Sequence, residues 1–185
     1  GSRLGGRLID EASLPGFASW RRVVDHRVHL LSRMPRVTIS LQSRLSADDV
    51  LAFGFRRVFV ATGSTWRRDG LGRRHREPIV EPGLANVFSP DDVFAGTPIA
   101  SPVAIYDDDH YLLGGALAER FARGGLEVHL LTPATKVSEW TDMTMEQPRI
   151  QARLMELGVR VQTAVELAGV RASGGGLALS LTSIY

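Results

Sequence analysis

The chain has 185 residues, of which 44% are hydrophobic and 23% charged, with a net charge of +2 and no cysteine. This balance is typical of a globular protein and excludes an intrinsically disordered one. Without cysteine the chain cannot form disulfide bonds or hold a cysteine-bound zinc ion or iron–sulfur cluster. No apolar run reaches the ~20 residues of a membrane span and no signal-peptide pattern is seen, so we expect a cytoplasmic protein without membrane contacts.

The first third of the chain predicts two helices and a strand. Apolar residues recur at helical spacing over Ala18–Met34, which indicates an amphipathic helix. Alternating apolar residues over Val37–Leu41 predict a strand. Ser46 is a suitable N-cap for a short helix that ends near Gly54.

A second strand is predicted over Val58–Ala61, and it runs into the turn Ala61-Thr62-Gly63. A buried strand that ends in small residues brings backbone amides to the carboxyl edge of a sheet. A flat or phosphorylated ligand can approach there without meeting side chains. The alternative interpretation of this turn is structural, namely a tight turn after a core strand.

An arginine-rich segment follows, with five arginines within ten residues: Arg67, Arg68, Arg73, Arg74 and Arg76. Three interpretations remain open, namely nucleic-acid binding, a solvated loop, and a contact with an anion, nucleotide or partner domain. Asp69 and Glu77 interrupt the run, and no DNA- or RNA-binding motif surrounds it. We therefore expect no nucleic-acid partner.

The strongest pattern is a βαβ unit between Pro102 and Pro133. Val103–Tyr106 and Val128–Leu131 are short apolar runs, and helical spacing of apolar residues over Tyr111–Arg123 separates them. Ser89 and Pro90 mark the start of another helix just before this unit. A strand, a helix and a strand within ~30 residues form the unit from which nucleotide-binding sheets are built.

The first turn of this unit does not suit a dinucleotide. A dinucleotide fingerprint reads G-x-G-x-x-G, so that the backbone can approach a pyrophosphate. Here Asp107, Asp108 and Asp109 occupy the tight turn, and glycines come only at Gly114 and Gly115. Three carboxylates repel a diphosphate, which argues against NAD(H) at this turn.

Two groups of polar residues invite a metal-site or catalytic interpretation. His26 and His29 are three residues apart on a predicted helix, but no third ligand lies nearby. Asp108, His110 and Tyr111 could form a proton shuttle. We expect them instead to cap the following helix and to form hydrogen bonds within the turn, with the acidic side chains in the place of a phosphate. No catalytic residue and no metal ligand is therefore predicted.

The last third of the chain predicts a helix and three strands. Glu146–Leu157 has helical spacing, and strands are expected over Val159–Thr163, Val165–Val170 and the alternating residues Leu177–Leu181. We expect these strands to form an antiparallel meander.

Together these stretches resemble a known family through the motifs LGGRL, ATG-x-x-WRRDG, PDDVFAG, YDDDHYLLGG and TPATKVSEWTDMTMEQPRIQ. They are similar to the C-terminal nucleotide-binding portion of the trimethylamine, dimethylamine and histamine dehydrogenases. That group is related to 2,4-dienoyl-CoA reductase among the old-yellow-enzyme-like NADH:flavin oxidoreductases. The resemblance implies an α/β, Rossmann-like FAD/NAD(P)-binding fold. Residues 1–88 would be an incomplete FAD-type lobe, 89–102 a connection, and 103–185 an inserted NAD-type βαβ lobe with the meander.

The resemblance also implies a function. The chain would be the FAD- or ADP-binding part of a multidomain flavin-dependent oxidoreductase, whose N-terminal barrel, FMN and 4Fe-4S cluster lie outside it. Alone, it would bind the nucleotide weakly or not at all. The chain alone would not be catalytic. Two alternatives are an NAD(P)H-binding reductase domain and a non-redox interaction module that uses the arginine-rich segment. The cofactor-binding residues implied are Gly5, Gly6, Ala61, Thr62, Gly63, Trp66, Arg67, Asp107, Asp109, Gly114 and Gly115.

Overall fold

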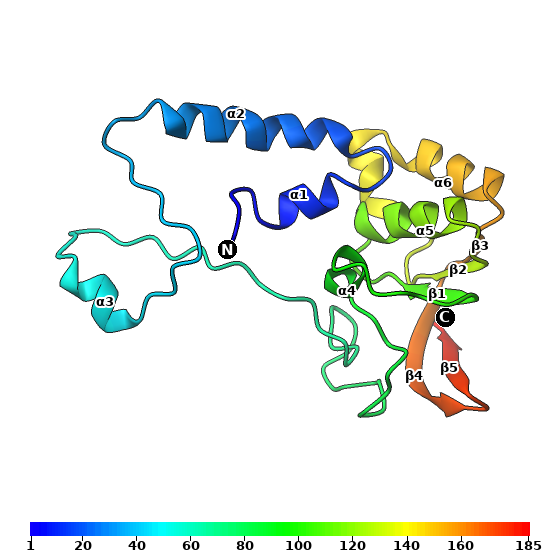
Figure 1. The fold of residues 1–185 in the computed structure, drawn as a ribbon. Helices are drawn as coiled ribbons and strands as arrows, with labels where there is room; N and C mark the ends of the chain where they lie inside the picture. The colour runs from blue at the N-terminus through cyan, green and yellow to red at the C-terminus, as the bar shows by residue number, and fades with distance from the viewer. The chain divides into compact units, whose positions relative to one another are not determined.

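In the computed structural model, which describes residues 1–185, the chain divides into two units after Thr65 (Figure 1). We call residues 1–65 the N-terminal unit and residues 66–185 the C-terminal unit. The sequence-based division at residues 88 and 103 stays a prediction.

The regular structure of the N-terminal unit is entirely helical. Its elements are α1 (Arg7–Glu11), the 3-10 turn η1 (Ala18–Trp20), α2 (Arg21–Ser32) and α3 (Ala47–Ala52). Together η1 and α2 account for the long helix predicted from apolar spacing. Ser46 caps α3 as expected, because the Asp49 carboxylate accepts the Ser46 N–H at 2.8 Å while the Ser46 hydroxyl accepts the Asp49 N–H at 3.2 Å.

The two strands predicted in the N-terminal unit do not form. Neither Val37–Leu41 nor Val58–Ala61 belongs to a strand, and Phe59 and Val60 are 91% and 81% exposed. A strand needs a neighbour to bond its backbone N–H and C=O groups. The prediction was wrong because the alternation of apolar residues shows suitability for a sheet, whereas no segment of residues 1–65 pairs with them.

The C-terminal unit contains the predicted βαβ unit. β1 (Val103–Tyr106) and β2 (Val128–Leu131) are parallel, with Ile105 opposite Leu130, and α5 (Leu113–Arg123) connects them. α4 (Pro90–Phe94) precedes β1, and the Asp92 carboxylate accepts the Ser89 N–H at 2.7 Å at its start.

A second crossover adds a third parallel strand. After β2 come η2 (Glu139–Thr144) and α6 (Gln147–Glu156), and β3 (Arg160–Gln162) then pairs with β2, giving the order β1-β2-β3. α5 and α6 lie beside each other on one face of this sheet (Figure 1). The core between them consists of the apolar side chains of Ala118, Val128, Leu130, Val137, Leu154 and Val159.

The final strands form a hairpin rather than a three-stranded meander. β4 (Val165–Ser173) and β5 (Gly176–Ser183) are antiparallel, with a bulge between Leu167 and Gly169. β3 was expected to belong with them, but it pairs with β2 in parallel. The crossover through α6 sets this direction, because it returns the chain to the end of the sheet at which β2 began.

Candidate functional site

The turn between β1 and α5 lies at the carboxyl edge of the parallel sheet. Asp107 is only 4% exposed, and its N–H donates to the Leu131 carbonyl of β2 at 2.9 Å. Its Oδ1 accepts the N–H groups of Asp109 at 3.1 Å and His110 at 3.3 Å, whereas its Oδ2 has no hydrogen-bond partner. A side chain that bonds the backbone two and three residues ahead fixes a turn. Asp107 therefore holds residues 107–110 in place, and α5 begins at Leu113 rather than at Tyr111.

Burial changes the protonation of this turn. It raises the pKa of Asp107 from 3.8 to about 6, against the opposing effect of the two backbone hydrogen bonds. Burial also lowers the pKa of His110, whose φ of 64° is in the left-handed region. Asp107 therefore changes charge much closer to neutral pH than an ordinary aspartate does.

The glycine pair at the start of α5 is packed against this turn and its surroundings. A Cβ on Gly114 would collide with the Asp107 carboxylate, and a Cβ on Gly115 would lie 2.9 Å from the Ser138 hydroxyl. Ser138 is fully buried, and its Oγ has no partner. The structure thus brings Asp107, Gly114 and Gly115 together, and their predicted cofactor-binding role stays a prediction.

The arginine-rich segment packs on the same turn. The Arg73 N–H donates to the Asp108 carboxylate at 2.8 Å, and its guanidinium lies 3.5 Å from the Asp109 carboxylate. The Arg73 guanidinium also stacks on the Trp140 ring, 4.4 Å from the ring centre. The backbone N–H of Trp140 donates to the His110 carbonyl at 2.9 Å. Arg73 thus bridges the acidic turn and η2.

The neighbouring arginines also have acidic partners within the C-terminal unit. Arg67 pairs with Asp69, and Arg68 pairs with Asp92. Arg74 lies 3.0 Å from Glu166 on β4. The backbone N–H of Trp66 donates to the Asp91 carboxylate at 2.7 Å. Much of the positive charge in this segment is therefore balanced locally, which weakens its interpretation as a nucleic-acid or diphosphate contact.

A half-buried polar cluster next to the arginine-rich segment was not predicted. His75 Nε2 lies 3.3 Å from the Glu166 carboxylate, and the His75 ring meets the Tyr106 ring edge-on with centres 6.1 Å apart. Burial raises the pKa of Tyr106 to about 12. Sequence reasoning missed this cluster and the roles of Arg73 and Trp140. The one available signal was charge complementarity between the arginine run and the three aspartates.

The remaining predicted residues lie in the N-terminal unit. Gly5 and Gly6 have φ values of 97° and 48° and lead into α1. Gly63 has a φ of 76°, and nothing lies within 4 Å of a Cβ built on Gly6 or Gly63. The Arg7 guanidinium donates to the Ser64 carbonyl. This bond brings the glycine pair and the Ala61-Thr62-Gly63 turn to one place.

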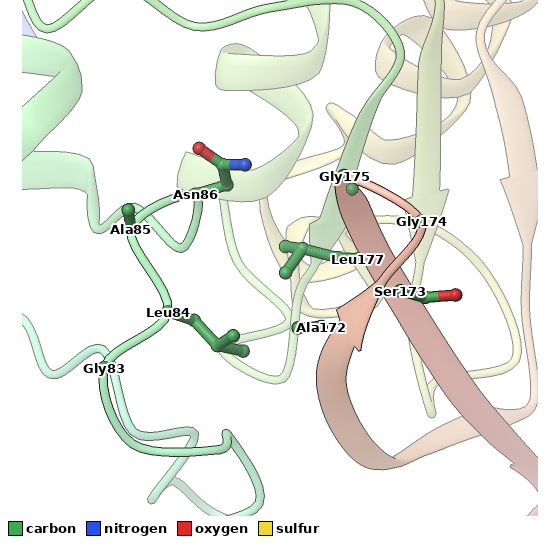
Figure 2. Close-up of a pocket in the computed structure, with 10 residues that line it drawn as sticks. Gly83, Leu84, Ala85, Asn86, Ala172, Ser173, Gly174, Gly175 and Leu177 are labelled. Carbon is green, nitrogen blue, oxygen red and sulfur yellow. The ribbon is translucent and has the colours of Figure 1, made fainter.

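An open hollow of about 380 Å³ lies between residues 83–86 and the β4–β5 turn. Leu84 and Leu177 point toward each other across it (Figure 2). Its lining contains no acidic, basic or imidazole side chain. Its polar side chains are those of Asn86 and Ser173, so it offers a ligand hydrogen bonds but no charge.

Neither a metal centre nor a membrane span is found. No group of three or more His, Cys, Asp or Glu side chains is placed to hold a metal ion. No helix is long and apolar enough to cross a bilayer.

Residues 88–175, which include the acidic turn and both crossovers, match the OYE-like second alpha/beta domain, where OYE denotes old yellow enzyme. Residues 88–175 belong to this domain family. The family span covers α4 to β4 of the C-terminal unit.

Related proteins carry names of amine-oxidising enzymes. Dimethylamine dehydrogenase from Hyphomicrobium sp. (strain x) is 34% identical over 167 residues, which cover 86% of this chain and 23% of the relative. Histamine dehydrogenase from Rhizobium sp. 4-9 is 41% identical with a TM-score of 0.85, over 98% of this chain and 29% of that one. The 6-hydroxypseudooxynicotine amine oxidase from Pseudomonas geniculata N1 is 38% identical with a TM-score of 0.91, over 100% and 27% of the two chains.

A more distant structure shares the fold of the OYE-like domain. A 2-naphthoyl-CoA reductase complex has a TM-score of 0.71 at 16% identity, over 97% of this chain and 25% of that one. The chain spans about a quarter of the length of the proteins it matches. The resemblance to dimethylamine and histamine dehydrogenases expected from the sequence is confirmed.

Proposed function

We propose that this chain is the adenine-nucleotide-binding part of a larger flavin-dependent oxidoreductase related to the amine dehydrogenases. In this proposal the fold is Rossmann-like, and the N-terminal unit holds ADP, free or as part of FAD. The names of the relatives, two amine dehydrogenases and an amine oxidase, support the reaction class of the whole protein.

The observation that carries the proposal is the open backbone around Gly6 and Gly63. Both residues have positive φ, and no atom occupies the space where a side chain would be. Glycine turns of this kind let a diphosphate approach main-chain N–H groups. The Arg7 side chain, which bonds the Ser64 carbonyl, places a cation between the two turns. Ala61 and Thr62 directly precede Gly63, whereas the Cβ position of Gly5 is filled by the Val24 and Ile9 side chains.

The acidic turn supports the exclusion of nicotinamide nucleotides from the C-terminal unit. The position at the start of α5, where a pyrophosphate binds in dinucleotide folds, faces the Asp107 carboxylate. Asp108 and Asp109 add two further negative charges, which Arg73 balances only in part. Of the two expected nucleotide positions, the one in the N-terminal unit is the better candidate.

The redox centres of the proposed enzyme would lie elsewhere in it. The chain has no cysteine, so it cannot hold a cysteine-bound 4Fe-4S cluster. We propose that an N-terminal barrel carries FMN and the amine site. The role of this chain would be to bind the nucleotide and dock against that barrel, without a catalytic residue of its own.

Calorimetric and thermal-shift titrations of the chain with ADP, FAD and NADH test the proposal. ADP and FAD should raise the melting temperature, and NADH should not. Gly63→Leu should abolish the effect by filling the open turn. Gly83→Leu is a matched control, since Gly83 also has positive φ and empty space around its Cβ position but lies in the C-terminal unit. Absence of ADP and FAD binding, or equal loss in both variants, would contradict the proposal.

A further inference from the structure

Two glycines around the acidic turn make room for side chains of the chain itself. A Cβ on Gly72 would collide with the Asp108 carboxylate, and one on Gly114 with the Asp107 carboxylate. In a nucleotide-binding loop, by contrast, the missing side chains make room for the ligand. Gly114, the first glycine of the pair in the βαβ unit, therefore leaves room for an internal contact.

The Asp107 carboxylate lies against the second residue of α5, which is an eleven-residue helix. The N-terminus of a helix favours negative charge, because its first N–H groups and its dipole point outward. Asp107 is 4% exposed, and its Oδ2 has no hydrogen-bond partner although it faces this helix start. Above about pH 6 a carboxylate charge is thus already present beside the helix start where a βαβ unit usually receives a phosphate, although it accepts N–H groups only from Asp109 and His110.

We propose that the Asp107 carboxylate is the resident anion of the α5 N-terminus, and that it closes the C-terminal unit to phosphates and dinucleotides. The proposal concerns residues 66–185 alone and holds whether or not the N-terminal unit binds ADP. Asp107 acts through volume as well as charge, because the chain leaves Gly114 without a side chain to accommodate it. Arg73, held by Asp108 and Asp109, covers the outer side of the turn.

A double-mutant cycle tests whether the Asp107 side chain fills the space beside Gly114. Gly114→Ala should lower the melting temperature by on the order of 5 °C, because the new methyl group meets the Asp107 carboxylate. In an Asp107→Gly background the same substitution should cost at most about 1 °C, because alanine suits a helix better than glycine. Asp109→Gly is the matched control, since it removes an equal charge from the same turn but leaves Asp107 in place. There the cost of Gly114→Ala should persist.

Asp107→Asn separates volume from charge, because asparagine fills the same space without a negative charge. Gly114→Ala should therefore remain costly in this background. If Asp107→Gly does not fold, Asp107→Ala removes the carboxylate but leaves its Cβ 2.7 Å from the new methyl group, so the cost of Gly114→Ala should fall only in part in that background. An equal cost of Gly114→Ala in all backgrounds would overturn the proposal.

Titration with inorganic phosphate tests whether the Asp107 carboxylate keeps other anions away from the start of α5. The unmodified chain and Asp109→Gly should show no saturable thermal stabilisation by phosphate beyond that given by chloride at equal ionic strength. Asp107→Gly should gain such stabilisation, because the helix start then lacks its own anion. Phosphate or NADH protecting the unmodified chain at residues 107–115, or no gain in Asp107→Gly, would overturn the proposal.

Discussion

Asp107 is the residue whose environment differs most from that of an ordinary aspartate. Burial raises its pKa to about 6 in the folded chain, against 3.8 for an unperturbed group. The folded state therefore binds the proton more tightly than the unfolded state. The stabilisation from this proton is fully present below pH 4, and it is lost as the pH rises through 6. The free energy of unfolding should fall over this range by on the order of 2–3 kcal/mol on account of this group alone.

Asp107→Asn should remove this part of the pH dependence, because asparagine does not titrate. Urea unfolding of the variant between pH 4 and 7.5 should give a flatter stability profile than the parent chain. Asp109→Asn is the control, since it makes the same chemical change at a side chain of the same turn that is 38% exposed, and the fall in stability due to Asp107 should persist in it. A parent profile that rises with pH across this range would contradict the interpretation of Asp107.

At the scale of elements, α6 shows how one buried side chain holds a crossover in place. Leu154 is 1% exposed in the core between α5, α6 and the sheet, whereas the adjacent Met155 is 67% exposed. Leu154→Ala should lower the free energy of unfolding by about 2–4 kcal/mol, because it leaves a cavity in this core. Met155→Ala should change it by less than about 0.5 kcal/mol. Chemical denaturation measures both, and similar losses would show that α6 is not docked as described.

The elements also show what the sequence could predict and why it failed elsewhere. The βαβ unit and α6 were predicted within about two residues, because each contains both its own spacing pattern and its own packing partners. The strands over 37–41 and 58–61 were wrong, since pairing is a property of two segments and a pattern describes only one. Asp107, Gly114 and Gly115 were singled out by the family resemblance, as parts of one altered fingerprint. Arg73 and Trp140 come from distant segments, so no local pattern could place them on the acidic turn.

At the scale of the whole molecule, the two units differ in how much apolar surface they bury. The C-terminal unit holds almost all of the buried apolar residues, whereas only Leu14 and Val24 are buried in the N-terminal unit. The backbone over Val58–Val60 has no strand partner. Local opening costs little free energy where so few contacts must be broken. The proposed nucleotide turn therefore lies in the less stable part of the chain.

Hydrogen exchange followed by mass spectrometry should reveal this difference. Amides over residues 56–63 should exchange within seconds, while those of Ile105 and Leu130, which lie in paired strands, should be protected for hours. If ADP binds as proposed, it should slow exchange over residues 61–64, because a nucleotide at this turn would order the open glycine backbone. Exchange over residues 107–115 should stay unchanged. Slow exchange over 56–63 without ligand would contradict the unpaired state of this segment. ADP-dependent protection confined to 107–115 would instead place the nucleotide at α5 and contradict both the proposed site and the closure by Asp107.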